Sequence, residues 1–524
     1  MPSRCLISVA ALAAVSGLAC SLSPASVTIY GGPTYNSTTG TGYQSPNLPV
    51  IPGESAGIAT AIGFASKYAG GTNLGPRAIR WDASGTAATE LGNLGTNGSG
   101  STSAYAYAIN SAGTTVGSAS KYSGGTNRGL RAVRWDASGT AATELGNLGT
   151  SGSGSTACVA SAINSTGTAV GHAQKYSGNT PLGNRAVRWD ASGTAALELG
   201  NLGTNNSGVA DCAAYAINST GTAVGIAQKY SGNTPLGNRA VRWDASGTAA
   251  TELGNLGTSS SGSTECVPFA INSTGTAVGH AQNYSGNTSL GISAVRWDAS
   301  GTVATELGNI GADNTGATIS YAFAINSTGT AVGRARKWKY PGTFLGDRAV
   351  RWDASGTGAT ELGNLGTNNA GITYSEALDI NDAGIAVGYA YKYSGSTYIG
   401  MRAVYWGFDG EAVDVNTLLS PADAARWTLT SAAGISDTNW VTGIGTFDPD
   451  GPGGLDSYAR MFLLQLPNGG CLSDFNHDGF VNGDDYDLFA SLFDVADPGA
   501  DINQDGFVNG DDYDAFASAF DAGC

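Results

Sequence analysis

Seven tryptophans recur along the chain at a nearly constant interval. The interval is 54 residues, with one of 55, and the tryptophans are Trp81, Trp135, Trp189, Trp243, Trp297, Trp352 and Trp406. A fixed period of this length marks a tandem repeat, in which each unit is one supersecondary element that packs against its neighbours. The spacing therefore restricts the chain to a repeat architecture.

Each unit contains four short apolar or alternating runs separated by Gly, Asn and Ser turns. In one unit the runs are Ala162–Asn164, Thr168–Gly171, Arg185–Asp190 and Leu197–Leu202. Runs bounded in this way predict four antiparallel strands joined by three hairpin loops. Four strands in about fifty residues are typical of one β-propeller blade, and closing the ring protects the sheet edges.

The strand count favours eight blades, with seven as the alternative. After the last repeated Trp, three further runs match the first three strands of a unit, but a fourth is missing. These runs are Ala432–Ile435, Trp440–Gly443 and Arg460–Leu464. We expect Ser26–Tyr30, a strand without a blade of its own, to supply it and close the ring. The alternative is a seven-bladed ring with an appended hairpin.

The amino-acid composition disfavours two classes of protein, nucleic-acid-binding proteins and generally disordered ones. The 524 residues include 25 Lys plus Arg against 41 Asp plus Glu, which gives a formal net charge of −16. A nucleic-acid-binding protein needs a basic surface to neutralise phosphates, so this class is disfavoured. With 41% hydrophobic residues the chain can bury cores, and general disorder is not expected.

Residues 1–25 have the features of a secretory signal peptide. A basic start ending at Arg4 precedes the apolar run Cys5–Cys20, and small residues end at Ala25. That run is too short to span a membrane, and no later segment reaches eighteen apolar residues. We expect a secreted or cell-surface protein without a transmembrane segment. The predicted domains after the signal are a propeller at 26–466, a short linker at 467–470 and a tail domain at 471–524.

The cysteines outside the signal fall into two groups. Cys471 and Cys524 bracket the tail, and we prefer a disulfide between them in an oxidising compartment. The others occur once per repeat in a slot that elsewhere holds Ala or Ser, which indicates a small buried position. A thiol metal site and disulfides between adjacent repeats are the alternatives. The slot holds Cys158, Cys212, Cys266, Ala104, Ser320 and Ser375.

The repeated motifs carry a family resemblance. Units read A-I-N-S-T-G-T-A-V-G, R-A-V-R-W-D and L-G-N-L-G, and the series closes with V-D-V-N-T-L-L-S-P and R-M-F-L-L. Over residues 50–466 this pattern resembles the bacterial extracellular HAF-repeat family, with Arg-Ala-Val in place of the usual His-Ala-Phe or Arg-Ala-Phe. The resemblance implies secretion and a propeller, without a settled biochemical activity.

The loops of such a propeller divide between two faces. Turns joining first to second and third to fourth strands are uniform, whereas the other loops vary, so we expect any ligand on this second, variable face. One aromatic recurs at the root of its loops. Such a ring of aromatics can stack on carbohydrate, although packing within each blade is the favoured interpretation. The aromatics are Tyr68, Tyr122, Tyr176, Tyr230, Tyr284, Trp338 and Tyr393.

Charged residues also recur in nearly every unit. They are the Arg-x-x-Arg-Trp-Asp motif and a following Glu. Catalysis needs one asymmetric group of residues, so charges repeated in every blade indicate a structural ion pair between strands. The glutamates are Glu90, Glu144, Glu198, Glu252, Glu306 and Glu361.

Enzyme signatures are sparse. The chain has no Gly-x-Ser-x-Gly or His-Glu-x-x-His motif, and His172 and His280 share one position two repeats apart. The acid cluster Asp448, Asp450 and Asp456 is read as a loop. A pair of carboxylates acting on glycosides remains the basis of the enzyme alternative.

The tail contains two copies of D-x-N-x-D-G-F-V-N-G-D-D, 27 residues apart. Oxygen ligands at positions 1, 3, 5, 7, 9 and 12, with Gly at position 6 for the sharp turn, suit calcium. The sequence therefore predicts two calcium ions. Their predicted ligands are Asp474, Asn476, Asp478, Phe480, Asn482 and Asp485, and Asp501, Asn503, Asp505, Phe507, Asn509 and Asp512.

Each calcium loop is followed by a single amphipathic helix and ends in Asp rather than Glu. These features resemble a type I dockerin over residues 474 to about 522. The resemblance implies a cohesin-like protein partner that reads loop positions 10 and 11. Those positions are Gly483, Asp484, Gly510 and Asp511, which differ from the Ser-Thr pair of cellulosomal dockerins.

These features predict a secreted, calcium-binding modular protein. Its propeller binds or displays a ligand without catalysis, and its dockerin-like tail, folded only with calcium, attaches to a cohesin-like partner. One alternative is a polysaccharide-degrading component of an extracellular complex. The other is a purely structural surface-display protein.

Overall fold

The computed structural model describes most of the chain. The described residues are 27–36, 38–39, 41–44, 51–55, 58–84, 88–339, 342–451, 453–467, 473, 475, 481–497, 500–502 and 507–522. The predicted signal peptide, most of the predicted linker and the predicted Cys471–Cys524 disulfide lie outside them. Among the described residues, no helix combines the length and the apolar character needed to cross a membrane.

One repeat shows how the sequence forms its strands. Its antiparallel sheet contains, in chain order, β12 (Cys158–Ile163), β13 (Ala169–Ser177), β14 (Thr180–Trp189) and β15 (Ala196–Glu198). The predicted four strands per unit are confirmed. The fourth strand, β15, ends at Glu198, whereas the predicted run extends to Leu202. The residues after Glu198 leave the sheet. The Gly200 N–H instead donates to the Thr248 carbonyl of the following repeat, at 2.6 Å.

The same sheet recurs along the chain, and we number the sheets as blades 1 to 8, with β12–β15 as blade 3. Blade 1 contains β4 (Ile51–Ser55), β5 (Ile58–Ala69), β6 (Thr72–Asp82) and β7 (Thr89–Glu90), with the hairpin β2 (Tyr35–Asn36) and β3 (Thr41–Gln44) added to β5. Blade 2 contains β8 (Ala104–Ile109), β9 (Thr115–Ser123), β10 (Thr126–Trp135) and β11 (Thr143–Glu144). Blade 4 contains β16 (Cys212–Ile217), β17 (Ala223–Ser231), β18 (Thr234–Trp243) and β19 (Ala250–Glu252).

The remaining blades follow the same order. Blade 5 contains β20 (Cys266–Ile271), β21 (Ala277–Ser285), β22 (Thr288–Trp297) and β23 (Ala304–Glu306). Blade 6 contains β24 (Thr318–Ile325), β25 (Ala331–Lys339), β26 (Thr343–Trp352) and β27 (Ala359–Glu361). Blade 7 contains β28 (Ser375–Ile380), β29 (Ala386–Ser394), β30 (Thr397–Trp406) and β31 (Ala412–Asp414). Blade 8 contains β32 (Trp427–Ile435), β33 (Trp440–Phe447) and β34 (Tyr458–Gln465), and follows η1 (Val415–Leu418) and α1 (Pro421–Ala424).

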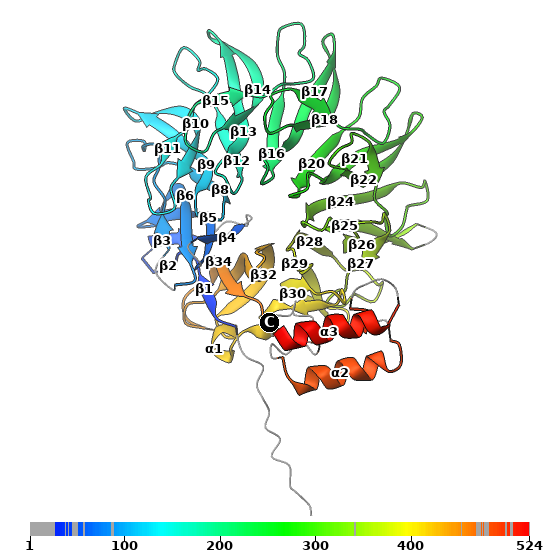
Figure 1. Ribbon diagram of the computed structural model, residues 1–524. Coiled ribbons are helices and arrows are strands. Elements are labelled where there is room, and N and C mark those ends of the chain that lie inside the picture. Colours follow the sequence, from blue (N-terminus) through cyan, green and yellow to red (C-terminus); the bar gives the residue numbers. More distant parts are fainter. Residues whose placement is uncertain are drawn as a thin grey trace, which may run out of the picture.

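The last blade is completed from the other end of the chain. β1 (Ile29–Gly31) pairs antiparallel with β34, placing Ile29 opposite Leu464. This confirms the predicted origin of the missing strand. The first strands of successive blades contact one another around the ring, and β32 contacts β4. The sheets therefore form a closed β-propeller (Figure 1).

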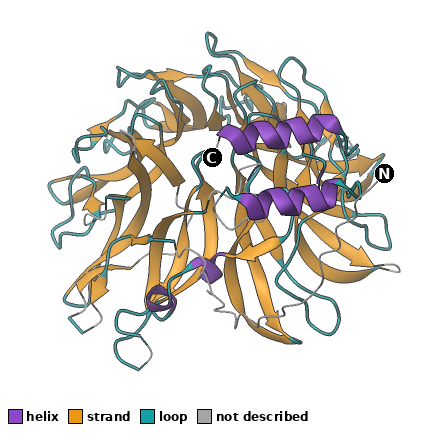
Figure 2. Ribbon diagram, turned by 60° about the horizontal axis from the view of Figure 1, so that its bottom comes forward, coloured by secondary structure: helices purple, strands orange, loops and turns teal. Residues whose placement is uncertain are grey.

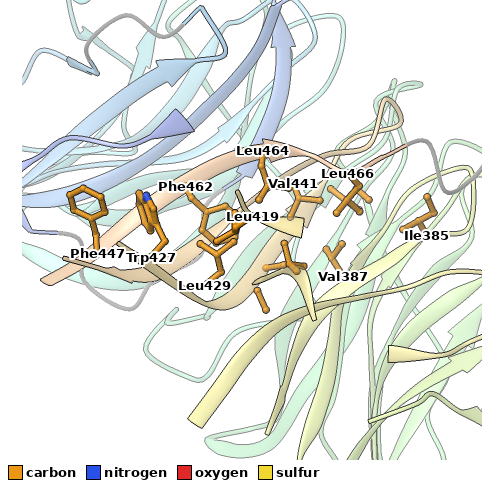
Figure 3. Packing of buried hydrophobic residues seen from close by; sticks show 14 of the residues in the cluster. Ile385, Val387, Leu419, Trp427, Leu429, Val441, Phe447, Phe462, Leu464 and Leu466 are labelled. Carbon is orange, nitrogen blue, oxygen red and sulfur yellow. The ribbon is translucent and has the colours of Figure 1, made fainter. Parts of the chain in front are cut away.

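The blades pack through small residues and one buried tryptophan each. Trp135 is fully buried, and its indole Nε1 donates to the Gly92 carbonyl of the preceding repeat at 2.9 Å. Most of the buried residues around it are small alanines, together with a few Ile, Leu and Val side chains, so neighbouring sheets approach closely. Between blades 7 and 8 the core is larger, and Figure 3 shows Val387 close to Val441 and Leu466 there. The same indole contact recurs at Trp189, Trp243, Trp297, Trp352 and Trp406.

A belt of asparagines joins the uniform turns. Asn110 Nδ2 donates to the Asn164 carbonyl at 3.1 Å, one repeat further on. The Oδ1 of Asn164 caps its own turn by accepting from the Thr168 N–H, at 2.9 Å. The Asn of each Ala-Ile-Asn run is therefore structural, which explains why these turns are uniform. The belt continues through Asn218, Asn272, Asn326 and Asn381.

The tail forms two helices, α2 (Gly483–Phe493) and α3 (Gly510–Ala522). Figure 2 shows them side by side. They pack through the fully buried rings of Phe489 and Phe516, which stack with centroids 4.1 Å apart. The predicted single helix after each loop is present.

Candidate functional site

The recurring glutamates form the ion pairs that the repeat pattern predicts. In blade 2, Glu144 Oε2 lies 2.6 Å from Lys121 Nζ, and Oε1 lies 3.1 Å from Arg131 Nε. The Arg131 side chain is only 3% exposed and also donates to the Thr156 carbonyl. Glutamate thus joins three strands of one blade to the loop beyond it. The arrangement recurs at Glu90, Glu198, Glu252 and Glu361.

The second arginine of each motif connects neighbouring blades. Arg134 Nη1 donates to the Ala191 carbonyl at 2.7 Å, and Nη2 donates to the Asp190 carbonyl at 2.9 Å. Both acceptors belong to a third-to-fourth-strand turn of the next blade. The Gly167 carbonyl, in a first-to-second-strand turn, accepts from the same guanidinium. The uniform face therefore has a structural role.

The repeated aromatics lie at the ends of the second strands and are distributed one per blade around the ring. Each is half-buried. The Tyr122 N–H donates to the Leu94 carbonyl of the preceding repeat at 3.1 Å, and Gly95 packs directly against the Tyr122 side chain. These contacts favour the packing interpretation. The structure does not bring the seven aromatics together into one site.

The cysteine slot is a small buried position, as predicted. Cys158 is fully buried, like Ala104 and Ser375 at the same place in other blades. Burial raises the pKa of the Cys158 thiol to about 12, which keeps it protonated. The thiols of Cys158, Cys212 and Cys266 are free, so disulfides between adjacent repeats are wrong.

The loop interpretation of the acid cluster agrees with its contacts. Both carboxylate oxygens of Asp450 accept from the Leu455 N–H of the same loop. Asp448 donates its N–H to the Arg426 carbonyl. These interactions fix the connection between β33 and β34.

Blades 6 and 7 carry a group of residues that departs from the repeat. β25 and β26 carry Arg334, Arg336, Phe344 and Asp347 where blade 4 has Ile226, Gln228, Pro235 and Asn238. Blade 7 adds Glu376, Tyr389, Tyr391 and Tyr398. The departures from the repeat are therefore concentrated in two adjacent sheets.

A network of charges connects these two sheets. Arg334 Nη1 lies 2.6 Å from Glu376 Oε1 and 3.1 Å from Asp347 Oδ2. Asp347 Oδ1 also accepts from Arg336 Nε at 3.2 Å. Burial opposes the charge of Arg334, but attraction by Glu376 and Asp347 outweighs it and raises the pKa of this guanidinium. Arg334 therefore remains a cation.

A continuous run of aromatic rings lies beside this charge network. Consecutive centroids are 5.3, 6.2, 5.1, 4.8 and 5.8 Å apart. The run is half-buried except at Tyr398, which is 48% exposed. In order, it contains Trp338, Phe344, Tyr374, Tyr391, Tyr398 and Tyr393. Two residues of the predicted aromatic ring, Trp338 and Tyr393, thus belong to this run.

A smaller aromatic group extends the departures into blade 5. His280 lies 5.2 Å from Phe269 and 5.0 Å from Tyr321, measured between ring centroids. Tyr321 also lies under the guanidinium of Arg334, at 4.9 Å. Burial lowers the pKa of His280 to about 4, so the imidazole is neutral at pH 7.

Trp338, Phe344, Tyr393 and Tyr398 lie at the hairpin ends of β25–β26 and β29–β30, on the variable face. Loops that enter each blade meet its second hairpin on this side, as when the Asn206 N–H donates to Asn233 Oδ1 at 2.8 Å. Sequence patterns missed the grouping, because Arg334 and Glu376 belong to different repeats. The detectable signal was the appearance of Arg334, Arg336 and Asp347 at positions that hold uncharged residues or His in the other units.

The tail was predicted to hold calcium, and part of each loop is described. Asp485 and Asp512, at loop position 12, are both fully buried. Asp485 Oδ2 accepts from the Asn482 N–H at 2.9 Å, and Asp512 Oδ2 accepts from the Asn509 N–H at 2.8 Å. The equivalent contacts show that the two loops end in the same way. Predicted ligands Asp474, Asn476, Asp478, Phe480, Asn503 and Asp505 lie outside the described residues.

Comparison with protein families gives one match. Residues 298–513 match a family described as a protein of unknown function, DUF3466. The matched segment runs from the end of blade 5 into α3. A comparison with curated proteins gives no match.

Comparison with solved structures gives distant similarities. The β-propeller domain of the Trilobed protease from Pyrococcus furiosus has a TM-score of 0.38 and 8% identity, covering 71% of this chain and 97% of that one. Prolyl oligopeptidase B from Galerina marginata has a TM-score of 0.43 and 9% identity, covering 80% and 55%. A protein of unknown function from Dyadobacter fermentans has a TM-score of 0.30 and 10% identity, covering 83% and 98%.

Proposed function

We propose that this is a secreted, calcium-binding modular protein with a non-catalytic, ligand-binding propeller. A dockerin-like tail attaches it to a cohesin-like partner. The observation that carries the proposal is the separation between two classes of residue. Residues repeated in every blade hold the sheets together, whereas residues that break the repeat gather on the variable face of blades 6 and 7.

The buried loop carboxylates support the calcium component. A carboxylate without water around it needs hydrogen bonds or a cation to offset the loss of hydration. Asp485 and Asp512 meet this condition in two loops whose remaining predicted ligands are also oxygens. Calcium would neutralise part of the tail's charge and hold each loop to its helix. The residues present therefore fit two calcium ions.

The first turns of α2 and α3 support the docking component. Gly483, Asp484, Gly510 and Asp511 are exposed there, immediately before the buried carboxylates. The two turns are chemically equivalent, so either can present the same short surface to a protein. Calcium binding at the adjacent loops would fix this surface, and partner binding should depend on calcium.

The test uses the full chain immobilised in calcium and exposed to secreted proteins from its own source. We expect one partner to be retained and to be released by a chelator. That partner, once purified, should bind wild-type protein and fail to bind the Asp485→Ala/Asp512→Ala variant. Equal binding by wild type and the double variant, or retention that persists in chelator, would contradict the docking function.

A further inference from the structure

We propose that the variable face of blades 6 and 7 binds an oligosaccharide that carries carboxylate groups. This inference rests on the proposed ligand-binding function and names the class of ligand. It replaces a ring of seven equivalent aromatics with one asymmetric site. Three observations carry it: the aromatic run, the polar network beside it and one arginine released from its usual partners.

The aromatic run provides the apolar part of the site. Tyr398 and the neighbouring Ile399 are 48% and 43% exposed at the tip of the β29–β30 hairpin. Tyr398 pairs across the hairpin with Tyr393, whereas Pro235 occupies that position opposite Tyr230 in blade 4. Rings with one apolar face and a polar end suit a sugar, whose ring also has an apolar face and polar edges.

Arg402 provides the charge that selects a carboxylate. Its counterpart Arg348 is 2% exposed and pairs with Glu361, with Arg348 Nε lying 3.2 Å from Glu361 Oε1. In blade 7 the corresponding acid is the shorter Asp414, which keeps the lysine pair, with Lys392 at 2.8 Å. Among the described residues, Arg402 therefore forms no salt bridge of the kind that Arg131 and Arg348 form.

Arg402 also loses a carbonyl acceptor, because the segment that connects blade 7 to blade 8 differs from the other connections. Elsewhere the loop entering the next blade offers a carbonyl to the arginine, as Thr373 does to Arg348. After blade 7 that loop is replaced by η1 and α1. Among the described residues, Arg402 donates to the carbonyls of Met401 and Ile399, at 2.9 and 3.2 Å. Arg402 is half-buried, its charge acts on Tyr398, and its guanidinium has donors left for a carboxylate.

The rest of the polar network suits hydroxyl groups. Arg334 and Arg336 are balanced by Asp347 and Glu376, so this part of the site has no net charge. Arg336 also lies over the ring of Phe344 at 5.1 Å, which fixes its plane. Arg402 adds a positive charge that forms no salt bridge among the described residues. A ligand with spaced carboxylates fits this arrangement better than a densely sulfated one.

Isothermal titration calorimetry on the full chain in calcium tests the proposal. The probes are oligogalacturonate and the same oligomer with its carboxylates methyl-esterified. We expect the acid to bind at least tenfold more tightly than the ester. Arg402→Gln should remove that preference, and Tyr398→Ala should weaken binding of both probes about tenfold, because it removes a stacking surface.

Two variants on the variable face of other blades serve as controls. Pro235→Ala changes the blade 4 residue that corresponds to Tyr398, and Arg128→Gln removes a cation from the variable face of blade 2. Neither should change the affinity for oligogalacturonate by more than twofold. Equal thermal stability of all variants would show that they are folded.

The other outcomes separate this inference from the proposed function. Equal binding of acid and ester, unaffected by Arg402→Gln, would overturn the carboxylate requirement and leave ligand binding intact. Binding unchanged in both site variants would overturn the location. Absence of binding to either probe would overturn the inference, while the calcium-dependent capture experiment would still decide the docking function independently.

Discussion

At the scale of single residues, the same few side chains are used in every blade. Glu144 accepts from a lysine on the second strand and an arginine on the third strand, and other repeats reproduce the distances to within a few tenths of an ångström. Blade 5 is an exception, since Glu306 meets Asn283 and Ser293 instead of cations. Comparing Glu144 with Glu306 therefore measures how much the ion pairs contribute to stability.

We predict that Glu144→Gln destabilises the protein more than Glu306→Gln does. The first change leaves Arg131 buried without its carboxylate and should lower the free energy of unfolding by about 1–2 kcal/mol. The second leaves no buried cation unpaired. Urea denaturation of both variants measures the difference, and equal losses would show that the ion pairs contribute little.

We predict that His280 makes stability depend on pH. Burial against Phe269 and Tyr321 lowers its pKa to about 4, so the unfolded chain takes up a proton at higher pH than the folded protein does. Its contribution is therefore present above the unfolded pKa of about 6.5 and is lost as the pH falls to about 4. In His280→Phe the fall in denaturation midpoint between pH 7 and pH 4 should be smaller. If the denaturation midpoint of His280→Phe depended on pH in the same way as that of the wild type, this role of His280 would be wrong.

At the scale of elements, the sequence predicted the blade because its signals are local. Alternating runs and turn residues define four strands in each unit, and the shortfall after Arg460–Leu464 identified the N-terminal strand that completes blade 8. The grouping of Arg334 with Glu376 could not be predicted in this way. Their contact depends on how one sheet packs on the next, which no single repeat encodes.

We predict that removing β1 opens the ring. A chain lacking residues 1–34 should lose about 2–4 kcal/mol of stability, because β34 becomes an unpaired edge and apolar contacts of Ile29 and Tyr30 are lost. Limited proteolysis should then cut within blade 8. A chain lacking only residues 1–25 is the control. It should have the same stability and the same resistance to proteolysis as the 524-residue chain.

We predict that Asp512→Ala reduces calcium binding from two ions to one. The carboxylate closes the second loop and is fully buried, whereas Asp514, two residues further on, is exposed on α3. Asp514→Ala should therefore retain both ions. Calcium titration of the full chain provides the stoichiometry, and two ions bound to Asp512→Ala would contradict the assigned role.

At the scale of the whole molecule, the repeat and its departures have different consequences. A closed ring fixes every blade relative to its neighbours, so the asymmetric residues of blades 6 and 7 are held by sheets on both sides. The period, together with four strand-like runs in each unit, predicted such a ring. It could not predict the release of Arg402, because that depends on η1 and α1 replacing a loop at one connection.

Hydrogen–deuterium exchange of the full chain, with and without oligogalacturonate, tests most directly whether ligand binding is confined to the departures from the repeat. We expect protection in the peptides covering β25, β26 and the β29–β30 hairpin, with the corresponding hairpins of blades 2 to 5 unchanged. Protection repeated in all seven aromatic-bearing hairpins, or absent from blades 6 and 7, would contradict a single asymmetric site.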